Sequence, residues 1–399
     1  MNHDQTDGTR DSTDFKITNG YLKLGYEINP HLKALADINL ADFNANDMGS
    51  IYAEPVPFNI DIQRGKTSFS LENHYDKMQG AFKYFLNFGE HNLSDGWHST
   101  DRNMGAMLYE SFKLFKGNSI TAGVDLKQYG GKGNGGKYSD TMLLVEEFAG
   151  YAYMQQTLLK KLTVSAGLRV ENNSDFGTEL VPMAGVNYCP LTSTTFKASV
   201  SKGFRSPTIM EKYLYAPNPD LEPERMMNYE VSWLQSLMKS KVSTELTLFI
   251  AEGENMIEVV GSYPNVIRQN VGSFTNKGIE FSTKVRATKD LFFNANYSYL
   301  NTNKKLLAAP EHQINVNANY SYKIFSLNLS IQHIRNLYTS TSLDTKENYT
   351  LLNARISTKA MKNINIFVSA NNLLDEYYEI NYGYPMPGIN FTGGLKLAL

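Results

Sequence analysis

The chain has a single cysteine, Cys189, among 399 residues, so it contains neither an internal disulfide framework nor a multi-cysteine metal site. It also lacks an excess of charge of either sign. Its 38 Lys and Arg and 40 Asp and Glu leave a net charge of −2, which gives no attraction toward nucleic acid. No segment approaches the roughly 20 consecutive apolar residues of a membrane helix, which excludes helical membrane spans.

The first residues of the sequence do not have the pattern of a signal peptide. Residues 1–14 are polar and include no apolar stretch of the kind that a secretory leader needs. We assign these residues as a polar lead-in. If the chain is exported, we expect either that a leader has been removed or that the chain is a fragment beginning at an internal methionine.

Aromatic residues are abundant, with 25 Tyr and 21 Phe, and they occur in segments whose polarity alternates from one residue to the next. Between Ile314 and Tyr322 the apolar residues alternate with three Asn and a Ser without interruption. Successive side chains of a β-strand point to opposite faces, so this period of two predicts strands with one apolar and one polar face. The sequence therefore predicts an all-β protein.

About 19 segments show this strand character, and most are long enough to cross a bilayer at a tilt, which takes roughly 9–11 residues. The segments lie near 15–28, 31–44, 60–73, 78–90, 100–115, 118–130, 142–158, 161–173, 178–190, 193–204, 223–237, 242–260, 270–286, 290–301, 312–322, 325–335, 349–359, 363–373 and 389–399. A soluble sandwich would show the same alternation, so the period alone leaves the orientation of the apolar face open.

The connections between these segments alternate between short and long. Turns of a few residues lie near 29–31, 116–118, 159–161 and 239–241, whereas the intervening links, such as 44–57 and 204–223, are much longer. Outer-membrane barrels have short periplasmic turns on one rim and long extracellular loops on the other. Closure also leaves no unpaired strand edge in lipid. We therefore predict a transmembrane antiparallel β-barrel located in the cell outer membrane.

Three motifs carry a family resemblance. Asn-Asn-Leu-Leu-Asp-Glu-Tyr-Tyr-Glu at 371–379 precedes Tyr-Gly-Tyr at 382–384, Ser-Lys-Gly-Phe-Arg-Ser-Pro-Thr occupies 201–208, and Asn-Lys-Gly-Ile-Glu occupies 276–280. Together they resemble TonB-dependent outer-membrane receptors over most of the chain. Ile389 is a departure, because many receptors have Arg at that point in the closing strand.

The resemblance implies a 22-stranded barrel that surrounds an N-terminal plug and takes up a scarce nutrient with energy from the TonB complex. Residues 15–399 would then be barrel, and the signal peptide, the plug and about three first strands would be missing. An odd number of strands also fails to close in the usual antiparallel way. The expected partners are outer-membrane lipid and lipopolysaccharide, the TonB complex acting through the missing plug, a small nutrient ligand and a surface lipoprotein, with no nucleic acid.

Aromatic and charged side chains in the long connections are the candidates for ligand binding, because amphipathic rings suit large planar or macrocyclic ligands. They are His91, Trp97, His98, Arg102, Tyr213, Tyr215, Tyr377, Tyr382 and Tyr384. Aromatic girdles occur in any such barrel, so each tyrosine also has a purely structural interpretation. The segment 374–384 looks most like that of cobalamin receptors, but siderophore and haem receptors end similarly, and both cobalamin and a siderophore stay open as cargo.

No arrangement of residues supports catalysis or a bound cofactor. We find no nucleophile beside a general base, and two histidines seven residues apart, His91 and His98, do not make a metal site without a third ligand. We expect no enzymatic activity. The alternative functions are a passive porin-like channel, a surface adhesin, or a truncated receptor that does not transport.

Overall fold

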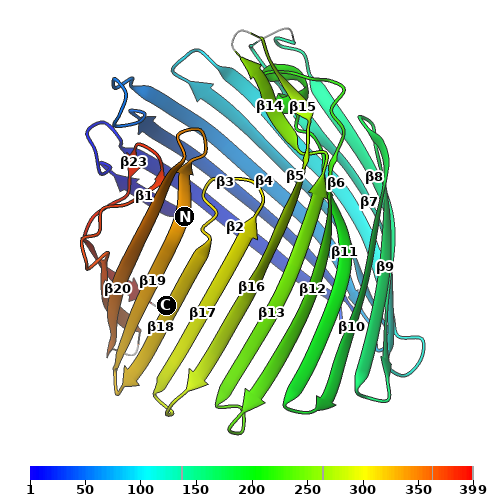
Figure 1. Cartoon of the computed structure of the whole chain (residues 1–399). Coiled ribbons are helices and arrows are strands. Elements are labelled where there is room, and N and C mark those ends of the chain that lie inside the picture. The colour runs from blue at the N-terminus through cyan, green and yellow to red at the C-terminus, as the bar shows by residue number, and fades with distance from the viewer. Residues whose placement is uncertain (136–137, 263–264, 362, 398–399) are drawn as a thin grey trace.

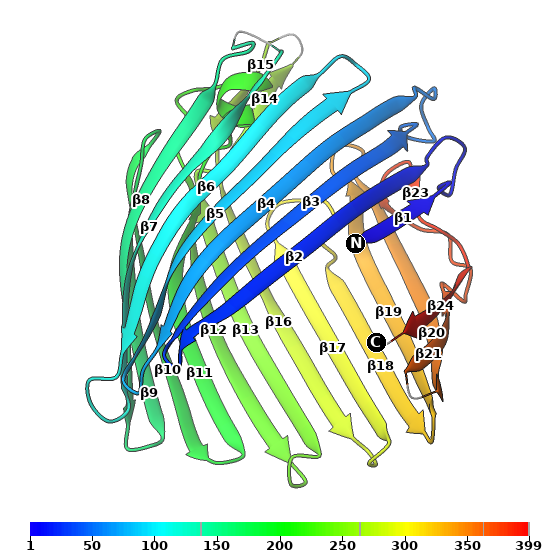
Figure 2. The same cartoon turned by 180° about the vertical axis from the view of Figure 1, so that it is seen from behind.

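The computed structural model describes residues 1–135, 138–262, 265–361 and 363–397, and almost all of them lie in β-structure. Twenty strands form one sheet, which curves round on itself in both views of the molecule (Figure 1, Figure 2). In both views β1 lies close to the segment that contains β23. The only helical element among the described residues is a π-helical turn, η1, at Met210–Leu214. No helix among the residues that the structure describes is long and apolar enough to cross a membrane.

The strands of the main sheet follow one another in chain order. They are β1 (Asn2–Thr6), β2 (Phe15–Asn29), β3 (Leu32–Asp47), β4 (Phe58–His74), β5 (Met78–Leu93), β6 (His98–Phe112), β7 (Asn118–Gly133), β8 (Leu143–Leu158), β9 (Leu162–Asn173), β10 (Gly177–Leu191), β11 (Thr194–Arg205), β12 (Glu224–Leu237), β13 (Val242–Glu254), β16 (Ser273–Arg286), β17 (Leu291–Thr302), β18 (His312–Tyr322), β19 (Phe325–Ser340), β20 (Thr345–Met361), β21 (Ile364–Asn371) and β24 (Asn390–Leu397). Two small hairpins, β14 (Ile257–Ser262) with β15 (Asn265–Asn270) and β22 (Glu379–Asn381) with β23 (Tyr384–Pro385), lie outside it.

The predicted all-β antiparallel fold is confirmed, and each of the 19 expected strands corresponds to one of β2–β13, β16–β21 and β24. Residues 398 and 399 of the expected last strand lie outside the described residues. The predicted strand 242–260 is wrong at its end, because β13 stops at Glu254 and Asn255 takes a left-handed φ of 59°. The chain then forms the β14–β15 hairpin before β16 pairs with β13. Within the polar lead-in, Asn2–Thr6 pairs with β2.

The two faces of the sheet differ in polarity, as β9 illustrates. Leu168 and Val170 on one face are 47% and 40% exposed, whereas Glu171 and Asn173 on the other are buried. Arg169 shares the polar face and forms ion pairs with Glu171 and with Asp125 of β7. Because exposed apolar side chains cover one face along strand after strand, that face suits lipid, and the paired charges face the interior of the curved sheet.

The connections at the two ends of the strands differ in length. Turns such as 159–161 and 238–241 contain consecutive left-handed residues, among them Leu159, Lys160, Met238 and Lys239, which tighten the chain reversal. These turns form one rim, the lower one in Figure 1, and the long connections with both small hairpins form the other. We call them the short-turn rim and the long-loop rim. The predicted asymmetry is thus present.

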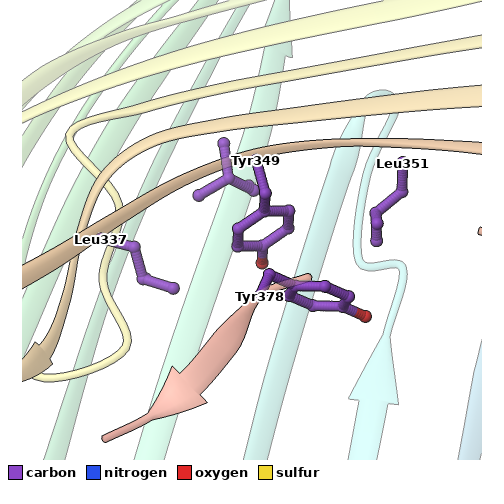
Figure 3. Close-up of a cluster of buried hydrophobic side chains, with 5 residues drawn as sticks. Leu337, Tyr349, Leu351 and Tyr378 are labelled. Carbon is purple, nitrogen blue, oxygen red and sulfur yellow. The ribbon is translucent and has the colours of Figure 1, made fainter. Parts of the chain in front are cut away.

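The last long connection packs onto the wall of the sheet. Tyr378, beside β22, contacts Tyr349 of β20 with ring centroids 4.3 Å apart, and Ile334, Leu337 and Leu351 complete a buried apolar cluster (Figure 3). The described structure therefore holds this loop firmly against β19 and β20.

Candidate ligand-binding site

A cavity of about 720 Å³ opens at the long-loop rim. It is bounded by the middle of β4, by the outer half of β5, by the outer ends of β6 and β7, and by the segment 206–214, which includes η1. Its size falls within the range of roughly 300–1,000 Å³ that is usual for small-molecule sites. Its polar and aromatic lining includes Arg64, Lys66, His91, Trp97, Ser99, Asp101, Asn103, Tyr129, Tyr138 and Thr208, with Met210 and Leu214 as apolar members.

A charged cluster forms one wall of the cavity. Arg64 Nη1 lies 2.6 Å from the Asp101 carboxylate and donates a hydrogen bond of 3.0 Å to Nε2 of His91. Gly89 lies between them in the strand register, opposite both Arg64 and Asp101. A Cβ atom at position 89 would come within 2.4 Å of Arg64 Nη1, so the glycine leaves room for the guanidinium to lie across the strand.

An indole ring forms the next part of the wall. Trp97 packs over Gly133 and Gly135, since a Cβ atom at either position would lie within 3 Å of the ring. Its Nε1 donates to Ser99 Oγ at 3.1 Å. Tyr138, which also lines the cavity, meets Tyr213 edge to face with ring centroids 5.2 Å apart. The cavity thus offers flat apolar surface beside charged groups.

The segment 206–214 is clamped on the opposite side. Arg205 donates to the Glu211 carboxylate at 2.9 Å and to Glu224 at 2.7 Å, and Thr208 donates its backbone N–H to Glu211. Burial raises the pKa of Glu211, but the hydrogen bonds from Arg205 and Thr208 outweigh that effect and hold the pKa below its usual range. Lys212, which is buried, is paired with Asp175 at 3.1 Å.

The sequence-predicted residues divide between this cavity and other places. His91, Trp97 and Arg102 line it, although the Arg102 guanidinium hydrogen bonds to Gln128. Tyr213 reaches the cavity only through Tyr138. The remaining candidates lie elsewhere: His98 contacts Asn92, Tyr215 lies under Arg268, and Tyr377, Tyr382 and Tyr384 gather in the last connection.

The last three tyrosines belong to a clasp that joins the last connection, residues 372–389, to the β1–β2 and β3–β4 connections. The buried Glu379 accepts hydrogen bonds from Tyr377 at 2.9 Å and from Tyr52, in the β3–β4 connection, at 3.3 Å. Tyr52 stacks on Tyr382 with centroids 4.6 Å apart. The Arg10 guanidinium lies 5.6 Å from the centre of the Tyr384 ring. We call this set the tyrosine clasp; its contacts are with protein groups.

Sequence reasoning missed Arg64, Tyr138 and Met210 as lining residues. Arg64 lies inside a strand, and only the pairing of β4 with β5 and of β5 with β6 brings it beside Asp101. The alternation of β4 could have shown that Arg64 shares a face with Lys66, but the distance to Asp101 depends on a register that one sequence does not contain. Among the described residues there is no cluster of three metal-binding side chains.

A large curved antiparallel sheet with an apolar outer face and a ligand-sized cavity at its long-loop rim defines a membrane β-barrel of the receptor kind. The chain belongs to the family described as TonB dependent receptor-like, beta-barrel, whose model matches residues 2–373. The resemblance read from the three motifs is thereby confirmed. The family consists of receptors and transporters of the outer membrane, and the predicted location is confirmed with it.

Known proteins resemble the chain over different extents. An iron-regulated outer membrane virulence protein of Vibrio cholerae serotype O1 is 24% identical over 65% of this chain and 46% of its own length. The vitamin B12 transporter BtuB of Photobacterium profundum is 22% identical over 92% of this chain and 62% of its own length. The solved structure of the copper transporter OprC superimposes with a TM-score of 0.83 at 13% identity, covering 99% of this chain and 74% of that one.

The chain thus spans about half to three fifths of the length of these two curated relatives. At 13% identity the copper transporter shows that the fold is shared and no more.

Proposed function

We propose that this chain is the barrel part of a receptor that binds a scarce nutrient at its outer mouth and takes it up with energy from the TonB complex. The observation that carries the proposal is the cavity at the long-loop rim, where Trp97 and Tyr138 lie beside the Arg64–Asp101–His91 cluster. Long loops of outer-membrane barrels are extracellular, so this cavity would face the medium from which cargo arrives.

The cargo classes that we propose are an iron–siderophore complex or cobalamin. One relative is named a vitamin B12 transporter and another an iron-regulated outer membrane protein, which makes these two the first to test. Both are large ligands with planar or macrocyclic parts, and an indole ring beside a guanidinium suits such surfaces.

Tryptophan fluorescence tests the binding step, because the chain has only two tryptophans and they lie in different surroundings. Trp97 lines the cavity, whereas Trp233 lies on the exposed apolar face and is 47% exposed. Ferric siderophores and cobalamin are titrated into the native protein and into its Trp97→Phe and Trp233→Phe variants. We expect one ligand class to quench the fluorescence in the native protein and in Trp233→Phe, with the ligand-dependent part lost in Trp97→Phe.

A second pair of variants checks the charged wall. Arg64→Gln removes both hydrogen bonds to Asp101 and His91, and we expect the affinity for that ligand to fall by about tenfold, the equivalent of one charge-assisted hydrogen bond. Lys197→Gln, which changes an ion pair with Glu245 away from the cavity, serves as the control. Quenching that survives Trp97→Phe, together with equal affinities in the two charge variants, would remove the cavity from the proposal.

A further inference from the structure

The charges of the molecule are distributed unevenly between its two rims. The described residues of the short turns include nine lysines but only two carboxylates, Asp76 and Asp290. The lysines are Lys77, Lys113, Lys116, Lys160, Lys161, Lys239, Lys241, Lys289 and Lys323. The described long connections, small hairpins included, contain 16 Asp and Glu against five Lys and Arg. The short-turn rim is therefore basic and the long-loop rim acidic, although the net charge of the whole chain is only −2.

The lysines of the short turns are exposed and lack acidic partners. All nine side chains are solvent-exposed, and within the part of the chain that the structure describes none of them forms an ion pair. The long-loop rim is different, since Lys212, Lys304 and Lys305 each contact a carboxylate within about 3 Å. The positive charge of the short-turn rim is thus available to a partner.

Apolar side chains accompany these lysines at the tips of the turns. Leu114 and Phe115 lie between Lys113 and Lys116 and are 62% and 61% exposed. Leu159, beside Lys160, is 92% exposed, Met238, beside Lys239, is 74% exposed, and Ile324, beside Lys323, is 53% exposed. An apolar side chain next to a lysine is the pattern of segments that sit at a membrane interface, with the ring or alkyl group in lipid and the ammonium among headgroups.

We propose that the short-turn rim is a basic collar that binds the phosphate groups of anionic phospholipids in the leaflet that it faces. The six lysine-bearing turns are spread along the rim from the β4–β5 turn to the β18–β19 turn (Figure 1, Figure 2). Exposed apolar side chains such as Leu158 and Leu237 lie at the strand ends next to these turns. A globular partner would dock on one side, whereas a ring of lipid headgroups contacts every turn. Clustered lysines next to an apolar belt attract anionic headgroups electrostatically. The collar is independent of the cargo site, which lies at the opposite rim.

The test uses the native polypeptide in neutral detergent, with phosphatidylglycerol or phosphatidylcholine of the same acyl chains added, and native mass spectrometry to count bound lipids. One variant combines Lys113→Gln, Lys116→Gln, Lys160→Gln, Lys161→Gln, Lys239→Gln and Lys241→Gln. A matched variant replaces the same six residues by Arg and so keeps the charge. Lys304→Gln with Lys305→Gln is the control at the long-loop rim.

We expect the native protein to retain phosphatidylglycerol in preference to phosphatidylcholine. The Gln variant should lose that preference, with phosphatidylglycerol affinity reduced about tenfold or more, whereas the Arg variant and the long-loop control should keep it. Salt should weaken phosphatidylglycerol binding by the native protein, a measurement that holds even if the Gln variant fails to assemble. Equal retention of the two lipids by the native protein, undiminished binding in a folded Gln variant, or binding that ignores salt would each overturn the proposal.

Discussion

Ile331 shows how one residue reports the orientation of the whole wall. It lies near the middle of β19, is 43% exposed, and pairs with Val316 of β18 and Leu352 of β20. Its neighbour Gln332 points to the opposite, polar face. Ile331→Arg should therefore destabilise the protein in a bilayer by about 2–4 kcal/mol, while Gln332→Arg should be tolerated.

Reversible unfolding from lipid vesicles in denaturant measures both changes. A similar loss of stability in the two variants would mean that the two faces have been assigned wrongly.

Tyr377, in the last connection, has a shifted pKa that can be tested by titration. Its hydrogen bond to Glu379 raises the pKa of the phenol from 10.0 to about 12, because ionisation would place two negative charges together. The contact therefore stabilises the folded loop fully below about pH 10, and this contribution is lost as the pH rises through about 12. Tyrosinate absorbance is titrated in the native protein and in Tyr377→Phe. The difference between the two curves is the ionisation of Tyr377, and we expect its midpoint near pH 12. A midpoint near pH 10 in this difference curve would mean that Tyr377 does not form the hydrogen bond to Glu379.

Glu379 organises the last connection at the scale of an element. It is buried and accepts from the two tyrosines and from the Gly383 backbone N–H at 2.6 Å. Glu379→Ala leaves these donors without a partner, and we expect it to destabilise the attachment of residues 372–389 by about 1–3 kcal/mol.

Limited proteolysis of the native protein reports this change, since a released loop is cut faster. Glu376→Gln is the control, because the Glu376 side chain forms no hydrogen bond or ion pair within the described residues. If Glu379→Ala is cut no faster than Glu376→Gln, the clasp does not hold the loop.

The strands could be predicted from sequence because their period of two reflects two different media on the two faces, and nothing else in the chain competes with that pattern. The end of β13 at Glu254 could not be predicted in this way. The apolar alternation continues into β14, and the strand is interrupted at Asn255, whose backbone is left-handed. The lining of the cavity was harder to predict from sequence than the strands were. Trp97 and His91 were recognisable as loop and strand-end residues, but Arg64 joins them through the registers of two strand pairs.

Tyr377, Tyr382 and Tyr384 were proposed as ligand-binding residues on their position in the last connection, and that proposal stays a prediction. Their contacts in the structure are with Glu379, Tyr52 and Arg10. One sequence does not show that residues 330 positions apart will meet, because that contact follows from the curvature of the entire sheet.

At the scale of the whole molecule, three features coincide along one axis. The ligand-sized cavity and the acidic connections lie at the long-loop rim, the apolar belt surrounds the strands, and the unpaired lysines lie at the short-turn rim. This arrangement agrees with the proposed receptor, which would take cargo at the long-loop rim and bind lipid headgroups at the short-turn rim. A passive pore, the alternative function, would need no ligand-sized site at its mouth.

Accumulation of radiolabelled ferric siderophore and of radiolabelled cobalamin in cells that produce the native polypeptide tests the proposed uptake most directly. Each uptake is compared with cells that lack the receptor and with cells that lack TonB. We predict that one of the two ligands accumulates, that accumulation requires both proteins, and that Trp97→Ala reduces it. Entry of either ligand that depends on the receptor but proceeds unchanged without TonB would contradict the account and make the protein a passive channel.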